Sequence, residues 1–546
     1  MAQHTPAMPR VWGVDYRWRT VVPTAVLAIF VALIPARTWP AYVGAVLGAS
    51  AVVAVGVITL GGHTGPQWIA SRIATWWRGR GHDPVDAPAD EDGHRPEVVS
   101  VLAGGEEVGV RWHGGQLVCV LDLHGHPQVL HLLSQRRVFS DAKIPVDELE
   151  TALANLGPAA PATVDVVFPS ARLARTSYTS IYDTHLSGRP VIGSRRTLLI
   201  ARFDPERAPA YYAARESLPD AAAHIMARLR RSLAAADCPS TALTGTQLCA
   251  FLDDSAPADQ ERWGYLAPVG EQLVDTVYSV DPQAFNDNRW PDLWSIRADE
   301  VVPVFRRDRK GRWSGFVRVR TSRPLPAPPL PFLRLLPGQQ GAAVAIGRPV
   351  AATAPPITVF EPVPSLAGLT LPTGSDGASL GLTEAGDEQL LPLVPGAGRI
   401  VSARVDDVYA EQLLLRAAAC GAHITLITDR PRRWAEVAGS RISIVAPDAA
   451  RPAGAAQLHV YDQRTPADAN DHPPKPPAEA LAASLGLIEL GGEEPEGHIT
   501  LDQIGEMVAV TVAGETTWIK AVVDASEVPL LPSARARVAA ASGARS

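Results

Sequence analysis

The first sixty residues are dominated by two uncharged apolar runs, residues 20–36 and 41–60. At ~1.5 Å per residue the two runs span roughly 25 and 30 Å as helices, against a hydrocarbon core of about 30 Å. Neither run has an amphipathic period, which argues against a pair of helices buried in a soluble core. The pattern therefore predicts a two-helix transmembrane hairpin over residues 20–62. The residues at its tip are Pro35, Arg37, Trp39 and Pro40.

Small residues recur along the second apolar run. Small residues let transmembrane helices approach one another closely, so we expect this helix to pack against the first one or against a partner's span. The helix-packing candidates are Gly44, Gly48 and Gly56.

A cleaved signal peptide is an alternative reading of the first run, with Arg10, Arg17 and Arg19 as its basic region. A second apolar run follows at once, however, and "LIPAR" is a poor small-x-small cleavage site. The sequence therefore favours an uncleaved anchor over a periplasmic protein.

Arginines flank the hairpin on both sides, at positions 10, 17 and 19 and at positions 72, 78 and 80, whereas Arg37 is the single one at the tip. Positive residues favour the cytoplasmic side of a membrane. We therefore expect a multi-pass protein of the inner (plasma) membrane with two helices and with both termini in the cytoplasm.

Residues 63–80 have the composition of a helix lying in the membrane interface, with an apolar face and arginines available to lipid phosphates. A plain cytosolic extension of the second helix is the alternative. The interfacial anchor residues are Trp68, Ile69, Ile73, Trp76 and Trp77, together with Arg72 and Arg78.

Composition divides the remaining chain into folded regions and linkers. After a cytoplasmic N-terminal segment (1–19), the hairpin and the interfacial segment, the expected parts are an acidic linker (81–97), a first α+β subdomain (98–322), a proline-rich connection (323–340), a second α/β subdomain (341–464), a proline-rich linker (465–480), a small β-rich module (481–525) and a disordered tail (526–546).

The first subdomain shows alternating apolar runs on either side of Gly114-Gly115, which predict a β-hairpin. Further strands are expected at 163–168, 197–203, 293–299 and 315–322, and a short helix at 147–156. An amphipathic helix is expected from about Pro219, with Ser217 able to cap it.

The second half alternates between helical and strand patterns. A helix before Gly421, a strand at 423–428, a helix at 432–439 and a strand at 441–446 indicate an α/β unit. Residues 506–523 predict one more hairpin. The fold class expected overall is an N-terminal transmembrane helical hairpin plus an α+β (mixed α/β) soluble region.

Charge and cysteine content exclude several classes of function. The net charge is -7 and neither end carries a basic run, so the sequence shows no nucleic-acid surface. The four cysteines are widely spaced without a C-x-x-C, which argues against a disulfide framework and a zinc knuckle. Free thiols in a reducing compartment are the simpler reading.

Motifs for catalysis are weak. The chain has no G-x-x-x-x-G-K-[ST] sequence, so it is no conventional P-loop motor. Residues 377–381 match G-x-S-x-G around Ser379, but turn-like sequence on both sides does not suit a nucleophile elbow. Asp406-Asp407 is better suited to capping the following helix than to acid–base chemistry.

Histidines gather in "HGHPQVLH", with His124, His126 and His131, and His113 precedes them. An H-x-H pair can bind zinc, but the Gly-Pro setting suggests a solvated turn. We predict no catalytic residue, no metal and no cofactor.

Several segments in order resemble the EccE family, a membrane component of the type VII (ESX) secretion systems of actinobacteria. They are the paired apolar spans with the Trp/Arg segment, "EEVGVRWHGGQLVCVLDL", "RRTLLIARFDPERAP", "LWSIRADE", "FLRLLPGQQ", "LPTGSDG" and "EQLLLRAAACGAHITLIT". The resemblance covers about residues 10–450, and the sequence beyond 465 is not matched.

The resemblance implies a structural subunit of an inner-membrane translocon that supports protein export. Its partners would be EccB, EccD, the mycosin protease and the ATPase EccC. EccC would hydrolyse the ATP, since this chain has no Walker motif. The family has no established catalytic residues to carry over. The rival interpretation is a membrane-anchored hydrolase or transferase at the cytoplasmic leaflet, with Ser379, His124 and His126 as its candidates.

Overall fold

The computed structural model describes most of the chain beyond residue 96 and short pieces before it. The described residues are 12–14, 43, 46, 48, 50, 58–60, 63–64, 95, 97–124, 129–135, 137–187, 189–213, 215–255, 260–267, 273–351, 360–393, 399–447, 458–462, 486–491 and 498–543.

The two flanks of the apolar N-terminal segment meet in a small antiparallel sheet. β1 (Trp12–Val14) pairs with β2 (Ile58–Leu60), with Trp12 opposite Leu60. β2 also pairs with β3 (His63–Thr64). The expectation of helix up to residue 60 is therefore wrong for its last three residues, where β-branched Ile58 and Thr59 suit a strand. The chain leaves this sheet after Val14 and returns to it at Ile58.

Part of the second apolar run is helical, at Val43, Val46, Gly48 and Ser50, and the Ser50 hydroxyl donates to the Val46 carbonyl at 2.9 Å. The hairpin tip, Gly44, Gly56 and all the interfacial anchor residues lie outside the described residues. Within the described ones, no helix has both the length and the apolarity that a membrane crossing requires. The predicted hairpin is therefore not tested here.

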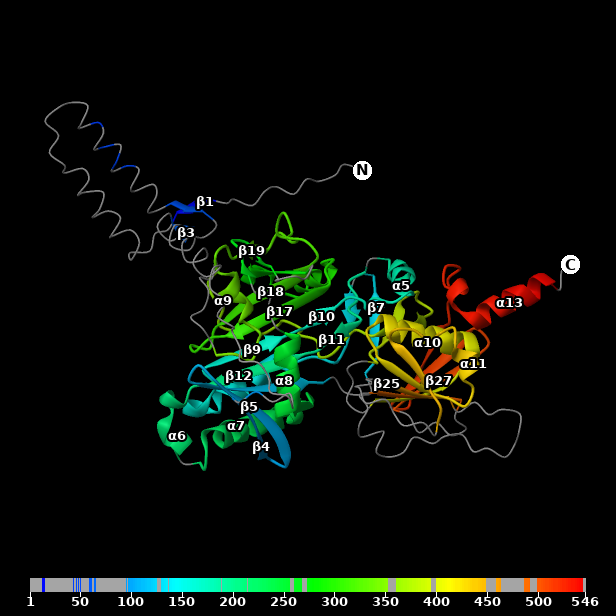
Figure 1. The fold of residues 1–546 in the computed structure, drawn as a ribbon, viewed down its shortest axis with the longest axis horizontal. Coiled ribbons are helices and arrows are strands. Elements are labelled where there is room, and N and C mark those ends of the chain that lie inside the picture. The colour runs from blue at the N-terminus through cyan, green and yellow to red at the C-terminus, as the bar shows by residue number, and fades with distance from the viewer. Residues whose placement is uncertain are drawn as a thin grey trace.

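The first large sheet is antiparallel and occupies one half of the molecule (Figure 1). Its strand order is β14 (Gln260–Glu261), β15 (Leu266–Ala267), β16 (Val274–Val280), β18 (Trp313–Thr321), β17 (Glu300–Arg307), β9 (Thr163–Val167), β12 (Leu198–Phe203), β6 (Gln116–Leu123), β5 (Glu106–His113) and β4 (Val98–Ala103). Short strands extend it: β10 (Ser170–Ala171), β11 (Ser194–Arg195), β13 (Ser240–Ala242) and β19 (Leu333–Leu335).

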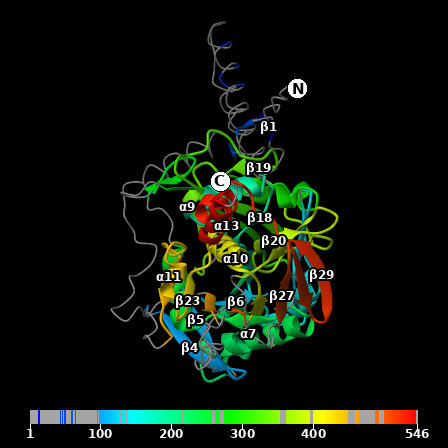
Figure 2. The same cartoon turned by 90° about the vertical axis from the view of Figure 1, so that its right-hand side faces the viewer.

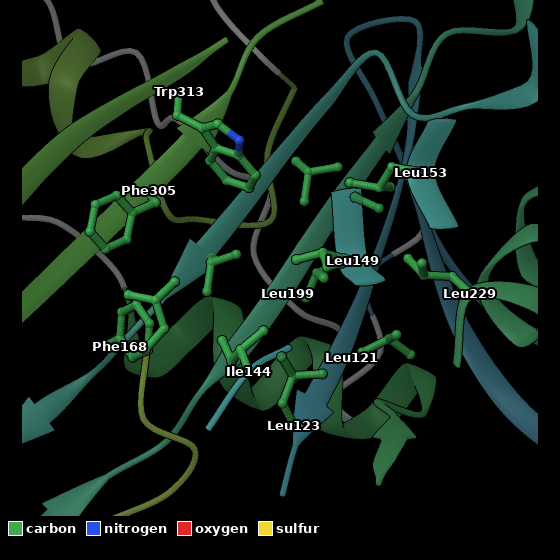
Figure 3. Close-up of a cluster of buried hydrophobic side chains, with 14 of the residues drawn as sticks. Leu121, Leu123, Ile144, Leu149, Leu153, Phe168, Leu199, Leu229, Phe305 and Trp313 are labelled. Atoms are coloured by element: carbon green, nitrogen blue, oxygen red, sulfur yellow. The ribbon is translucent and has the colours of Figure 1, made fainter. Parts of the chain in front are cut away.

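Helices bury both faces of this sheet. Successive side chains of a strand point to opposite faces, so β6 sends Leu121 and Leu123 to one core and Val118 and Val120 to the other. On the first face lie α4 (Val146–Ala154), α6 (Pro209–Ala213) and α7 (Leu218–Ala235). On the second lie α8 (Gly245–Asp254) and α9 (Gln340–Val344). Figure 3 shows Leu121 and Leu199 of the sheet close to Leu149 of α4 and Leu229 of α7.

Two local predictions in this half are confirmed, a turn and a helix cap. Gly114 and Gly115 have φ of 54° and 75°, as a two-residue turn between β5 and β6 requires. Ser217 caps α7 by accepting a hydrogen bond from the Asp220 amide. Short 3-10 turns complete this half: η1 (Gly157–Ala159), η2 (Pro205–Arg207) and η3 (Pro282–Ala284).

The strand expected at 293–299 is wrong: its first three residues belong to the 3-10 segment η4 (Trp290–Ser295), and residues 296–299 are not in a strand. Pro291 in its first turn lacks an amide donor. Trp290 and Trp294 are both buried there, edge-on to Phe168 in the first core. Burial of two large aromatic rings outweighs the strand pattern.

The second large sheet combines a parallel and an antiparallel part. The parallel strands run in the order β24 (Ile442–Val445), β23 (Ile424–Ile427), β25 (Leu458–Asp462), β26 (Gly486–Leu490), β22 (Arg399–Arg404) and β27 (Ile499–Ile504). Along the chain, α10 (Asp407–Ala419) connects β22 to β23, and α11 (Pro431–Trp434) connects β23 to β24. The predicted α/β unit is confirmed, and Gly421 ends α10 with φ of 102°.

The antiparallel part continues from β27 through β28 (Met507–Val512), β29 (Glu515–Lys520), β20 (Ala378–Leu382), β21 (Glu388–Leu391), β7 (His131–Ser134) and β8 (Arg137–Phe139). The hairpin predicted at 506–523 is therefore present. It is not part of a separate module over 481–525, because β26 to β29 are strands of this same sheet.

The two halves exchange segments across the expected boundary at 323–340. β7 and β8 leave the first half and complete the second sheet, and α5 (Thr179–His185) buries Tyr182 in the second core. In return, Leu366 and Leu371 pack in the first core. The division at that boundary is thus corrected: apolar side chains from both sides of it are shared between the cores.

The C-terminal residues, expected to be disordered from 526 onward, are folded up to residue 543. They form η5 (Val528–Leu530) and α13 (Pro532–Gly543), and Leu531 is completely buried in the second core. Figure 2 shows α13 beside α10. The composition of this segment is alanine-rich and polar, which suggested disorder, but a few buried residues such as Leu531 anchor it to the second core.

Candidate functional site

Ser379 is the second residue of strand β20 and is 1% exposed. A nucleophile elbow needs a sharp turn between a strand and a helix. Here strand β21 follows β20 instead, and the Ser379 hydroxyl lies 3.5 Å from Nη1 of Arg416. The G-x-S-x-G match therefore reflects the packing of a strand and offers no accessible nucleophile.

The described histidines of the predicted cluster are separated by the fold. His113 Nδ1 accepts from the Ala351 amide at 2.9 Å, and His124 Nε2 lies 2.8 Å from the Thr241 hydroxyl. His131 is on β7 in the other sheet, and His126 lies outside the described residues. In the described ranges, no group of three His, Cys, Asp or Glu side chains is arranged to hold a metal ion.

The Asp406-Asp407 pair serves as a helix start, as the sequence predicts. Asp406 is the N-cap of α10 and accepts from the Tyr409 amide at 2.9 Å. It also accepts from Gln503 and from Arg537 of α13, both at 3.1 Å. These bonds stabilise its charged form, so its pKa lies below the ordinary value although burial opposes the shift.

A cluster of buried charges lies where α5, β20, β21, α10 and the C-terminal segment meet. We call it the buried charge cluster, and its members are Tyr178, Tyr182, His185, Arg189, Glu388, Arg416 and Glu527.

Arg416 and Glu527 form the centre of this cluster. Arg416 Nη2 donates to Glu527 Oε1 at 3.1 Å, and the side chains are 1% and 0% exposed. The Tyr178 hydroxyl donates to Glu527, and Gln412 Nε2 donates to it at 2.7 Å. Burial alone would raise the pKa of Glu527, but the Arg416 charge and the Tyr178 hydrogen bond hold it below its usual value.

Glu388 forms the other end of the cluster. Its carboxylate is completely buried, lies 2.9 Å from His185 Nε2, and is paired with Arg189. Burial raises its pKa, whereas hydrogen bonds from His185 and Ser379 and the charge of Arg189 lower it to about 2. Glu388 therefore stands between Ser379 and His185, so the histidine is not placed to take a proton from the serine.

The cluster is arranged for holding segments together. Its acids are matched by arginines or hydrogen-bond donors, and its members come from segments more than 300 residues apart. Removing one partner of such a buried pair leaves an uncompensated charge and is costly. Chemistry on a substrate would need access to the two carboxylates, Glu388 and Glu527, and both are completely buried.

A second buried ion set ties the segment after α9 to the first sheet. Asp165 on β9 lies between Arg202 (2.8 Å) and Arg306 (2.7 Å), and it accepts from the Gly347 amide at 3.0 Å. Arg202 also donates to the Val350 carbonyl at 2.6 Å. This set could not be predicted from the sequence, because its members alternate with apolar residues along ordinary strands.

The buried charge cluster was likewise missed by sequence reasoning. Arg416 lies in a helix that the sequence does predict, and only the apolar residues on either side of it distinguish it from a solvated arginine. Its partner Glu527 was assigned to a disordered tail. The available signal was the apolar surround of Arg416, since most residues of α10 are buried on every side.

Comparison with known proteins shows which proteins this chain resembles in sequence. The family model described as "Putative type VII ESX secretion system translocon, EccE" matches residues 191–280. ESX-2 secretion system protein EccE2 of Mycobacterium tuberculosis is 26% identical over 432 residues, which cover 75% of this chain and 79% of the relative. ESX-1 secretion system protein EccE1 of Mycolicibacterium smegmatis is 26% identical over 70% of this chain and 76% of its own length. These matches confirm the resemblance seen in the sequence: the chain is similar to EccE proteins of type VII secretion systems over most of its length.

Proposed function

We propose that this chain is a structural subunit of a type VII (ESX) secretion complex in the cell membrane. The observation that carries the proposal is the similarity to EccE proteins over most of the chain, since those relatives are ESX secretion-system proteins. The chain would support protein export by holding other components in place.

The geometry favours a scaffold over an enzyme. Ser379 is buried in a strand, and the described histidines are engaged singly in different parts of the fold. The buried charge cluster is internally matched and connects distant segments. A rigid scaffold needs such connections, because they keep distant segments in fixed positions relative to one another when a partner pulls on one of them.

The small N-terminal sheet supports the two-span anchor. β1 and β2 flank the apolar segment and are paired with each other, so both ends of that segment lie together. A membrane hairpin has this property, because both its ends emerge on one side. With the arginine bias of the flanks, the proposed topology places both termini and the large sheets in the cytoplasm.

Cysteine labelling tests this topology. The four native cysteines are buried, so labelling at Cys119 would not report on its side of the membrane. Engineered cysteines at Thr38, in the proposed tip, and at exposed Ser542 on α13 are better probes. A membrane-impermeant maleimide should label Thr38→Cys in intact cells and Ser542→Cys only after permeabilisation. The opposite result would overturn the topology.

The proposed partners are EccB, EccD, the mycosin protease and the ATPase EccC. An ATPase partner is needed because this chain has no Walker motif. Deletion of the chain should stop export of the system's substrates while their synthesis continues. Unchanged export in the deletion strain would contradict the proposed function.

A further inference from the structure

A cavity of about 240 Å³ lies at the junction of the two halves of the molecule. One wall comes from β8, the last described strand at one edge of the second sheet, and the opposite wall from η4 of the first half. Six of its fourteen lining residues are aromatic or proline, namely Phe139, Pro190, Trp290, Pro291, Trp294 and Pro372.

Arg195 supplies a fixed positive charge to this cavity and is only 1% exposed. Its Nε donates to the Gly374 carbonyl and its Nη2 to Asp376, both at 2.6 Å. The guanidinium carbon lies 5.1 Å from the centre of the Trp294 ring. The bonds of Nε and Nη2 hold the guanidinium in place. Its Nη1 makes no hydrogen bond to any described residue, so Nη1 can donate to a ligand.

The rim of the cavity adds two more cations. Lys143 and Arg137 are exposed, and neither is paired with a carboxylate within the described ranges. Both acids of the lining are already engaged: Asp376 by Arg195, and Asp287 by the amide and hydroxyl of Thr370 at 2.8 Å. The cavity therefore favours a ligand with a negative charge.

The size of the cavity argues for side chains rather than a whole cofactor. Small-molecule sites usually enclose roughly 300–1,000 Å³, more than this cavity offers. The adjoining strand β8 lies at a sheet edge, where backbone groups can pair with an added strand. Phe139 on that strand lines the cavity and is 54% exposed, so its ring is accessible to a partner.

We propose that the junction cavity binds a peptide segment of another subunit in which an acidic side chain stands beside an apolar one. The carboxylate pairs with Arg195 Nη1 and Lys143, and the apolar side chain packs against Phe139 and Trp290. The inference rests on the proposed function only in taking the peptide's owner to be a component of the secretion complex.

Site-specific photocrosslinking in intact cells tests this. The photoreactive residue p-benzoylphenylalanine replaces Phe139, and in a control chain it replaces Leu102, which is 73% exposed on the edge strand β4 of the first sheet. The Phe139 position should form an adduct whose peptide carries Asp or Glu next to an apolar residue, and the control should not form that adduct. Lys143→Glu should lower the adduct yield about fivefold, and Lys143→Arg should leave it within about twofold of the parent.

The result separates the inference from the proposed function. No adduct at Phe139, an adduct with lipid, or a yield unchanged by Lys143→Glu would overturn the inference, while co-purification of the other components would still support the proposed function. An acidic–apolar peptide from a protein outside the secretion complex would support the cavity's chemistry and contradict the proposed function.

Discussion

Arg416 and Glu527 are 111 residues apart in sequence, yet their side chains form a completely buried ion pair with an N–O distance of 3.1 Å. Arg416 lies on the central helix of the second half, and Glu527 precedes the C-terminal helix. The pair therefore connects the C-terminal segment to the second half.

Replacing Glu527 with alanine should destabilise the protein strongly. The change leaves the Arg416 guanidinium buried without its partner, which costs roughly 3–5 kcal/mol in such sites. Glu506→Ala is the matched control, because Glu506 forms an exposed pair with Lys520 and should cost less than about 1 kcal/mol. The free energy of unfolding in urea measures both, and equal values would show that the buried pair has no special weight.

Removal of residues 524–546 should have a larger effect than Glu527→Ala. It takes away Glu527, buried Leu531 and Ser533, whose hydroxyl and amide both donate to the buried carboxylate of Glu411. A loss of more than about 5 kcal/mol is expected from the exposed apolar surface and unmatched charges. Removal of 544–546 alone is the control and should be neutral. Equal stability of the two truncated chains would mean that the C-terminal segment only rests on the fold.

Acid should weaken the second half through Glu388. The pKa of Glu388 is lowered to about 2 in the fold, from 4.5 as its ordinary value. A lowered folded-state pKa gives stability that is complete above the ordinary value and is lost as the pH falls toward the folded one. The wild-type chain should thus lose stability as the pH falls from about 4.5 to about 2, and Glu388→Gln should lose less over that window. Denaturation midpoints across this range are the measurement, and parallel pH profiles would refute the assignment.

Ser379→Ala and His124→Ala should leave export intact, because a scaffold does not need these groups as catalysts. The Ser379 hydroxyl donates to Glu388 and lies 3.5 Å from Arg416, and Glu388 keeps His185 and Arg189 as partners, so the loss of the hydroxyl should cost no more than about 3 kcal/mol. Loss of export by a stably folded Ser379→Ala chain would revive the enzyme interpretation.

Gly377 lies two residues before Ser379, and its replacement is expected to be more costly than that of Ser379. It has φ of 98°, and an added Cβ would lie 2.2 Å from the Leu391 backbone. Gly377→Ala should therefore destabilise the chain by more than about 3 kcal/mol. The glycine of this motif is needed for the close approach of strands, and a normal melting temperature for Gly377→Ala would show otherwise.

Sequence reasoning succeeded where the signal is local. The Gly114-Gly115 turn, the Ser217 cap and the alternation around α10 are each contained in a few residues. The mixed α and β character of the large region follows from such elements. The family resemblance was also readable, because it rests on an ordered series of short segments.

The failures share a different cause, namely contacts between distant parts of the chain. Phe139 and Tyr182 lie in the first half of the sequence and serve the second sheet or its core, which no local pattern reveals. The buried pair of Arg416 and Glu527 depends on a segment whose composition resembles a solvated tail. The strand expected at 293–299 was overridden by the burial of Trp290 and Trp294.

Affinity purification of the tagged full-length chain from native membranes, followed by mass spectrometry, tests the central claim most directly. A structural subunit of the secretion complex should bring EccB, EccC and EccD with it in stable proportions, and Glu527→Ala should reduce their recovery more than Glu506→Ala. Recovery of the chain alone, from membranes that contain the other components, would contradict the account.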